Sequence, residues 1–422
     1  MRILYDLSFI IFGMAYLPYM IITKRYRYGM TNRFGFLSRR FKSVISKKKV
    51  IWLHAVSVGE IKVASILAPL LRKTFPSHVL VFSTVTHTGN KVAKTIATGE
   101  EEVIYLPFDV SFIVDKVVRI VRPELFLCLE TELWPNLINS LHRFGSKIIL
   151  VNGRISNKSY SGYKKIRFIT SRILPQFSLI LMQSEQDRER ILVLGAPKEK
   201  VFTPGNLKFD LSLSGFTDKR QETRERLNVS DDEILLIAGS THRGEEEKII
   251  ECFSRLKKDY SSLKLLIAPR HIERIKEIEE LLKARRLKSI RFSKPQTDCP
   301  KSVFILDTIG DLRTVYSAAD IVFIGGSLVK KGGQNPIEPA ALARPVIFGK
   351  DMSNFHDVAR SFLENKACLE VSTQEELYIA LRSLLDDQDK RSSLGINAKD
   401  TVVKNSGSSE RAINLISSVF PN

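Results

Sequence analysis

The sequence predicts an α/β fold of two successive domains, each built on a parallel β-sheet. Short apolar runs alternate with amphipathic helices, as where residues 50–53 precede a stripe of Ile61, Ala64, Leu67 and Leu71. Polar clusters follow these runs, and a serine- and glycine-containing stretch at 211–218 separates two such sets. A length of 422 residues fits two or three domains.

The first set of apolar runs predicts six strands in the N-terminal half. They are expected at residues 50–53, 79–82, 103–108, 125–129, 148–151 and 179–182. Polar motifs follow three of them: HAVSVGE at 54–60, ETELWPN at 130–136 and NGRIS at 152–156. Because parallel strands end at one edge of a sheet, these motifs are expected to face one crevice.

The second set predicts strands at 234–238, 263–268, 303–306, 321–324 and 345–349. We therefore expect a domain at 26–210, a second at 220–405, and a C-terminal helix at 406–422. Two consecutive sets of this kind predict Rossmann-like domains that face each other across a cleft, an architecture typical of nucleotide-sugar glycosyltransferases.

Residues 320–339 carry the densest set of ligand-binding signals. The strand at 321–324 leads into glycine pairs at 325–326 and 332–333, where a ligand could approach backbone N–H groups. Asn335 and Pro336 have the usual order of helix cap and first helical residue, and Glu338 could accept hydrogen bonds from a ribose. The segment predicts a nucleotide pocket; the alternative is a tight strand-to-helix turn without a ligand.

Charge and missing motifs narrow the class of protein. The formal charge of +19 favours an anionic partner such as phosphorylated substrate, anionic lipid or nucleic acid. The four cysteines form no CxxC pair, which argues against a zinc site. Motifs of P-loop ATPases, serine hydrolases and HExxH metalloproteases are missing, and no strand ends in the Asp-x-Asp that holds a divalent metal.

The N-terminus predicts a membrane anchor at 1–25. Residues 7–22 are apolar and uncharged, and Lys24, Arg25 and Arg27 follow, so this flank is expected on the cytoplasmic side. The helix could instead lie within the membrane interface or belong to a soluble core. A cleaved signal peptide is disfavoured because bulky basic and aromatic residues follow the apolar run.

Glu60 could act as a general base, since it follows a strand-to-helix turn and a helix N-terminus favours its ionised form. A first-turn glutamate that only stabilises the helix dipole is the ordinary alternative. Glu130 and Glu132 flank Thr131, and Lys208 could neutralise a departing phosphate; each could equally be a solvated side chain. Further polar candidates after predicted strands are Arg154, Arg270, His242 and His271.

Seven motifs together resemble the bacterial 3-deoxy-D-manno-octulosonic acid (Kdo) transferases of lipopolysaccharide assembly. They are HAVSVGE (54–60), ETELWPN (130–136), VNGRIS (151–156), GNLKFD (205–210), APRH (268–271), GDL (310–312) and GGSLVKKGGQNPIEPAA (325–341). The resemblance implies an inverting glycosyltransferase of the two-domain GT-B type. It would transfer Kdo from CMP-Kdo to the lipid A precursor, at the cytoplasmic face of the inner membrane, without a metal or other cofactor.

The resemblance also implies roles for individual residues. Glu60 matches the family's proton acceptor, and Glu130 and Lys208 match residues that stabilise the transition state. The CMP-binding positions that match are Pro269, Arg270, Gly310, Asp311, Leu312, Asn335, Pro336, Ile337 and Glu338. Asp311 stands where many relatives have Glu, so its contact to the nucleotide is expected to differ.

Two other functions compete with this reading. Another two-domain enzyme that uses a UDP-sugar would share the fold, and binding of CMP rather than UDP would decide between them. A nucleic-acid binder would explain the positive charge, but no binding module is recognisable, so no nucleic-acid partner is expected. The number of Kdo groups added, the acylation and phosphorylation of the acceptor, and the oligomeric state do not follow from the sequence.

Overall fold

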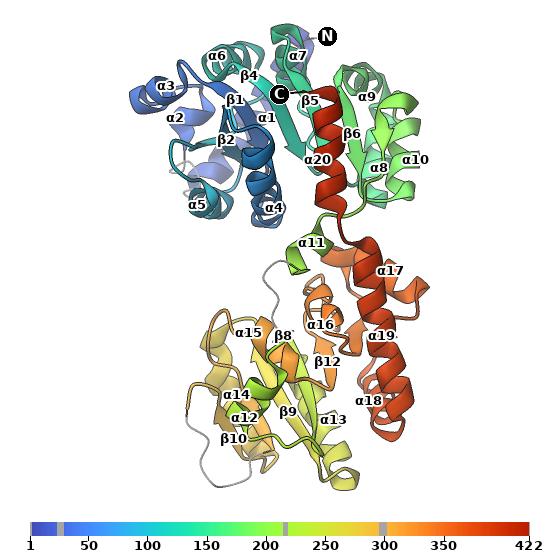
Figure 1. Cartoon of the computed structure of the whole chain (residues 1–422). Coiled ribbons are helices and arrows are strands. Elements are labelled where there is room, and N and C mark those ends of the chain that lie inside the picture. The colour runs from blue at the N-terminus through green and yellow to red at the C-terminus, as the bar shows by residue number, and fades with distance from the viewer. Residues whose placement is uncertain (1, 23–28, 214–217, 295–301, 422) are drawn as a thin grey trace. The chain divides into compact units, whose positions relative to one another are not determined.

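The computed structural model describes residues 2–22, 29–213, 218–294 and 302–421 (Figure 1). It divides into two compact units, which are described separately. The first comprises Met1–Leu211 together with Ser406–Asn422, and the second comprises Ser212–Asn405. Each unit contains a parallel sheet with helices around it, which confirms the predicted α/β fold.

The first unit is built on a seven-stranded parallel sheet in the order β3-β2-β1-β4-β5-β6-β7. The strands are β1 (Lys49–His54), β2 (His78–Thr84), β3 (Glu102–Tyr105), β4 (Pro123–Leu129), β5 (Lys147–Gly153), β6 (Leu179–Met182) and β7 (Val201–Phe202). The order reverses between β1 and β4, which lie side by side. In open α/β sheets, ligands bind at the carboxyl edge of such a switch point.

Helices cover both faces of this sheet, so successive residues of β1 alternate between two buried clusters. Flanking helices include α4 (Val58–Thr74), α5 (His87–Ile96), α6 (Ser111–Val121), α7 (Pro135–Phe144), α8 (Asn157–Lys165), α9 (Arg167–Ile173) and α10 (Glu185–Val193). The C-terminal helix α20 (Ser408–Val419) also belongs here, because Ala412, Ile413 and Ile416 pack in the cluster that contains α4.

Helix α1 (Arg2–Ile22) begins with polar contacts to its own unit. Arg2 pairs with Asp115 of α6, and Tyr5 donates a hydrogen bond of 2.9 Å to Asp109. Within the described ranges, no helix combines the length and apolarity that crossing a membrane requires. The basic flank of the predicted membrane anchor, at 24–27, lies outside the described residues.

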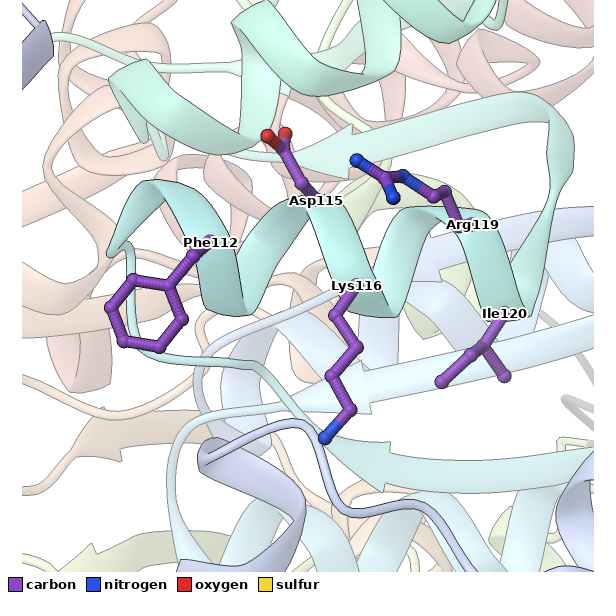
Figure 2. Close-up of a pocket in the computed structure, with 5 residues that line it drawn as sticks. All are labelled: Phe112, Asp115, Lys116, Arg119 and Ile120. Carbon is purple, nitrogen blue, oxygen red and sulfur yellow. The ribbon is translucent and has the colours of Figure 1, made fainter.

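The short helices α2 (Met30–Arg33) and α3 (Arg39–Ile45) lead from this region into β1. The outer face of α6 borders a hollow of about 440 Å³, which is lined by Phe112, Asp115, Lys116, Arg119 and Ile120 (Figure 2). None of these residues belongs to the predicted site.

The second unit has its own seven-stranded parallel sheet, in the order β10-β11-β9-β8-β12-β13-β14. The strands are β8 (Ile234–Thr241), β9 (Leu263–Pro269), β10 (Ser289–Arg291), β11 (Val303–Ile305), β12 (Ile321–Ile324), β13 (Val346–Gly349) and β14 (Cys368–Val371). Its helices include α12 (Arg220–Leu227), α13 (Glu246–Asp259), α14 (Ile275–Ala284), α17 (His356–Glu364), α18 (Gln374–Asp386) and α19 (Gln388–Asn405). The order reverses between β8 and β12.

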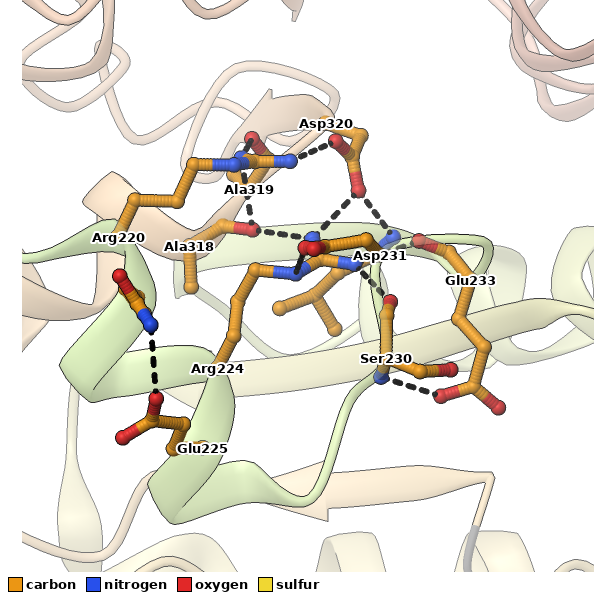
Figure 3. Close-up of polar contacts among 11 residues, drawn as sticks. Arg220, Arg224, Glu225, Ser230, Asp231, Glu233, Ala318, Ala319 and Asp320 are labelled. Atoms are coloured by element: carbon orange, nitrogen blue, oxygen red, sulfur yellow. Dashed lines mark hydrogen bonds and ion pairs between the residues drawn. The ribbon is translucent and has the colours of Figure 1, made fainter.

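A buried charge network fixes α12 to the amino end of β12 (Figure 3). The carboxylate of Asp320 accepts hydrogen bonds from Arg220 at 2.6 Å and from Arg224 at 3.0 Å. Arg224 is 3% exposed and also donates to the carbonyl groups of Ala318 and Glu233. Because a buried charge is costly unless it is paired, the contacts of Arg224 with Asp320 and the two carbonyl groups specify how α12 docks.

Candidate active site

Glu60 lies at the switch point of the first sheet, in the first turn of α4. Ser57 caps this helix, and its Oγ donates a hydrogen bond of 2.9 Å to Glu60 Oε1. The Val56 N–H donates to Glu60 Oε2 at 2.5 Å. The Ser-x-x-Glu spacing thus folds the carboxylate back over the helix N-terminus, as in a capping box.

Burial sets the charge of this carboxylate. Glu60 is 7% exposed, and burial, followed by the negative charge of Glu130, raises its pKa to about 7. The hydrogen bonds from Val56 and Ser57 favour the ionised form and limit the rise. A carboxylate with a pKa near neutrality can both accept a proton and release it, as a general base must.

Two further acids lie beside Glu60, at the carboxyl end of β4. Glu130 has a left-handed backbone conformation, with φ of 54°, and its N–H donates to the Val151 carbonyl at 3.0 Å. Burial, followed by the charge of Glu60, raises the pKa of Glu132 to about 7. The two motifs at 54–60 and 130–136 therefore place three carboxyl groups at one edge of the sheet.

Lys208 joins this group, with Nζ 3.5 Å from Glu130 Oε1. It opens helix α11 (Lys208–Leu213), and the preceding turn is held by two asparagines. Asn152 Oδ1 accepts a hydrogen bond of 3.0 Å from the Leu207 N–H, and Asn206 Oδ1 accepts one of 3.0 Å from the Lys208 N–H. The three predicted catalytic residues are thus brought together within the first unit.

Sequence reasoning gave no role to Asn152, which is fully buried with φ of 58°. A single asparagine after a strand is too common a pattern to have indicated that its side chain holds the turn before Lys208. His54 was also missed: it is fully buried at the end of β1, and burial lowers its pKa to about 4. It is therefore neutral at physiological pH.

In the second unit, the glycine-rich loop after β12 surrounds a buried carboxylate. Glu245 is fully buried, and it accepts backbone hydrogen bonds from Gly326 at 2.7 Å, Ser327 at 3.1 Å and Leu328 at 3.0 Å. The Gly326 N–H, which the sequence suggested was open to a ligand, is thus already bonded within the protein. No pattern pointed to Glu245, because an acid after a Gly near a helix start is usually solvated.

The glycines of this region permit close packing between neighbouring strands. A Cβ at Gly325 would lie 2.4 Å from the Ser240 carbonyl oxygen, and one at Gly239 would lie 1.9 Å from the Tyr316 hydroxyl. Gly326 also has φ of 73°, which L-residues rarely adopt. The first glycine pair is thus required by packing and backbone conformation.

Asn335 and Glu338 lie together, but the helix begins later than predicted. Helix α16 (Ile337–Ala341) has Pro336 at its N-cap, so Pro336 is not the first helical residue. Asn335 Oδ1 accepts from the Ile337 N–H at 3.1 Å, and its Nδ2 donates to Glu338 Oε1 at 3.1 Å. This contact fixes the direction of the Glu338 carboxylate.

The remaining predicted nucleotide-binding residues follow other strands of the same sheet. Pro269 ends β9, and the exposed Arg270 donates its N–H to the Thr241 carbonyl at 2.9 Å. Gly310 forms an exposed turn with φ of 99°, and Asp311 and Leu312 lead into the short helix α15 (Leu312–Val315). The structure therefore locates them at strand ends without testing their roles.

His242 and His271, weaker candidates in the sequence, lie next to each other with ring centroids 5.8 Å apart. Burial, followed by the positive charges of His271, Lys331 and Arg270, lowers the pKa of His242. A positively charged region thus lies where β8 and β9 end, suited to an anionic group. Within the described part of the chain, no group of three or more His, Cys, Asp or Glu is placed to hold a metal.

Two family models match the chain in succession. Residues 28–211 match the model for 3-deoxy-D-manno-octulosonic-acid transferase, and residues 218–401 match the model for glycosyl transferases group 1. The 3-deoxy-D-manno-octulosonic acid transferase of Haemophilus influenzae is 35% identical over 394 residues, covering 93% of this chain and 91% of that protein. The chain belongs to the Kdo transferase family.

This membership confirms the resemblance and the assignment as a glycosyltransferase. A bifunctional glycosyltransferase/methyltransferase of Fusobacterium nucleatum is 37% identical over 380 residues, covering 86% of this chain but only 58% of that protein. The structure of UDP-GlcNAc 2-epimerase from Neisseria meningitidis superposes with a TM-score of 0.59 at 13% identity, over 87% of this chain and 99% of that one. At this identity the likeness shows the fold alone.

Proposed function

We propose that this Kdo transferase moves Kdo from CMP-Kdo to the lipid A precursor, with inversion at the anomeric carbon. The observation that carries the proposal is Glu60, a buried carboxylate with a pKa of about 7 held over a helix N-terminus beside Glu130. It lies in a segment that matches the Kdo transferase model, and the motif resemblance puts the family's proton acceptor at this position.

In the proposed reaction, a hydroxyl group of the acceptor sugar attacks the anomeric carbon of Kdo. Glu60 accepts the hydroxyl proton while the new carbon–oxygen bond forms. The bond between the anomeric carbon and the CMP phosphate oxygen breaks, and CMP leaves with the electron pair. A single displacement of this kind inverts the configuration.

Lys208 and Glu130 act as a pair in this proposal. Lys208 offers positive charge where negative charge develops on the departing phosphate, and its ion pair with Glu130 holds the ammonium group in place. Glu130 also raises the pKa of Glu60, so it makes the base more basic than a solvated glutamate.

The donor nucleotide is assigned to the second unit. Arg270 and the neighbouring His271 offer donors for the phosphate, and the Glu338 carboxylate, oriented by Asn335, could accept from the ribose hydroxyls. The general base Glu60 belongs to the first unit, and the residues assigned to the nucleotide belong to the second. Turnover by this route therefore uses residues of both units. We also propose that no metal is needed.

We further propose that the chain works at the cytoplasmic face of the inner membrane. Apolar side chains of α1 are exposed, including Ile3 at 82%, Leu4 at 70% and Met14 at 61%. Exposed basic residues Arg39 and Lys42 follow on α3, where anionic headgroups would attract them. An interfacial helix with a basic neighbourhood fits attachment without a membrane span.

Incubation with CMP-Kdo and a lipid A precursor, followed by mass spectrometry of the lipid, tests this function. Each transferred Kdo adds its mass to the acceptor, so the assay also counts additions. Wild-type chain is expected to transfer and Glu60→Gln to lose transfer while it still binds CMP. An unmodified acceptor with the wild-type chain would refute the proposal.

A UDP-sugar enzyme remains the second candidate. Thermal shift with CMP and with UDP separates the two, because at equal concentration the ligand that binds more tightly stabilises the folded protein more. We expect CMP to raise the Tm and UDP to raise it far less. The reverse order would favour the UDP-sugar enzyme.

A further inference from the structure

Two helices next to the candidate active site begin at residues that cannot cap them. The N-cap of α6 is Val110 and that of α7 is Trp134, and neither makes a side-chain capping bond. Backbone N–H groups at a buried helix start need acceptors, since an unmet buried donor destabilises the fold. The acceptors therefore have to come from elsewhere in the fold.

Two aspartates supply these acceptors. Asp6 of α1 accepts from the Ser111 N–H, which opens α6, at 3.0 Å. Asp109 accepts from the Asn136 N–H at 3.1 Å and from the Leu137 N–H at 2.8 Å, in the first turn of α7. Carboxylates are also the groups that the positive end of a helix favours.

Asn136 joins the two caps into one network. Its Nδ2 donates to Asp6 Oδ1 at 2.7 Å and to the Asp109 carbonyl at 2.7 Å. Tyr5 completes the network by donating its hydroxyl to Asp109 Oδ2 at 2.9 Å. Asn136 and Asp109 are 4% and 2% exposed, so water cannot easily replace these bonds.

Asn136 is the last residue of the motif at 130–136, which carries Glu130 and Glu132. Helix α7 starts at Pro135, so holding Asn136 fixes the C-terminal end of the segment that bears both acids. Helix α1 is thus hydrogen-bonded, through Asp6, to the start of α7, which directly follows the two acids.

We propose that Asp6 is a positioning residue for catalysis, which holds the segment 130–136 through Asn136 and the start of α7. This rests on the proposed function, in which Glu130 and Lys208 act in the transition state. Helix α1 would then serve two functions. Its exposed apolar side chains attach the chain to the membrane, and Asp6 sets the position of Glu130 and Glu132. A misplacement of about 1 Å in such a segment costs on the order of 10²-fold in rate.

The test measures Kdo transfer by full-length variants, with the acceptor dispersed in detergent so that membrane attachment does not limit the rate. Asp6→Ala removes both bonds that Asp6 accepts, and kcat is expected to fall about 10-fold or more while the KM for CMP-Kdo stays unchanged. Asp6→Asn keeps an oxygen acceptor, so it should recover most of the rate. Arg2→Ala is the matched control, since Arg2 lies on the same helix but pairs with Asp115.

Binding of each variant to vesicles of anionic phospholipid separates positioning from membrane attachment, and it should be equal for Asp6→Ala and wild type. Unchanged kcat in Asp6→Ala, or an equal loss in Arg2→Ala, would overturn the inference. If Asp6→Ala fails to fold, Tyr5→Phe decides, because it removes one bond and should lower kcat several-fold at unchanged KM. A wild-type chain that transfers no Kdo would overturn the proposed function and this inference together.

Discussion

The raised pKa of Glu60 predicts that this residue destabilises the first unit at alkaline pH. The folded state binds the Glu60 proton more tightly than the unfolded chain, with a pKa of about 7 instead of 4.5. Its contribution to stability is therefore fully present below pH 4.5 and is lost as the pH rises through 7. Glu60→Gln removes this titration, so the variant should gain stability relative to wild type at high pH.

The size of the effect follows from the two pKa values. A shift from 4.5 to about 7 corresponds to about 3 kcal/mol in all, of which about 2.5 kcal/mol falls between pH 5 and pH 8.5. The ionised Glu60 also raises the pKa of Glu132, so the variant relieves part of that cost as well. Any packing difference between Glu and Gln is the same at both pH values and cancels from the comparison.

Urea unfolding followed by tryptophan fluorescence measures this effect. The chain has two tryptophans, Trp52 and Trp134, and both lie in the first unit, so the signal reports that unit. The free energy of unfolding of Glu60→Gln minus that of wild type should rise by about 2 to 3 kcal/mol from pH 5 to pH 8.5. If the free energies of unfolding of Glu60→Gln and wild type change in parallel with pH, the raised pKa of Glu60 is refuted.

Three further substitutions test the two halves of the site. Lys208→Ala should lower kcat about 10²-fold, because the charge that meets the departing phosphate is lost; steady-state kinetics measure this loss, and an unchanged kcat would remove Lys208 from the mechanism. Arg270→Ala should weaken CMP binding about 10-fold, since a charged hydrogen bond to phosphate contributes about 1.5–3 kcal/mol, and an unchanged dissociation constant would remove Arg270 from the site. Glu245→Ala should destabilise the second unit by about 3–5 kcal/mol, because it strands buried N–H groups. Faster hydrogen exchange of the amides at 325–328 reports this loss of stability. Glu245→Gln should lose less stability than Glu245→Ala. Equal protection of these amides in wild type and both variants would contradict the prediction.

The strands and the first-turn glutamate could be predicted because their signals are local. The apolar run at 50–53 and the Ser57-to-Glu60 spacing each fall within a few residues, and the structure has a strand and a capped helix there. The apolar run of α1 could also be recognised from the sequence, although it is short for a membrane span. The polar contacts of Arg2 and Asp6 could not be predicted, because their partners lie about a hundred positions away.

Long-range pairing explains the other misses. The carboxylate of Glu245 meets Gly326 across 81 positions, and nothing near either residue indicates the other. The same holds for Asn152, whose bond to Leu207 spans 55 positions and places Lys208. The helix predicted at 406–422 is present as α20, but its packing in the first unit rests on Ala412 and Ile416, which join a core far from them in sequence.

The carboxylate of Glu245 accepts the hydrogen bonds of N–H groups in the glycine-rich loop, as a bound anion would. The backbone at 326–328 therefore takes its shape when the unit folds, so under the proposed function a nucleotide would not have to order it. Conformational entropy that many glycine-rich loops lose on binding is here lost during folding. If CMP binds here as proposed, its affinity would depend on the side chains around the loop, and changing them would alter the preferred base without rebuilding the turn.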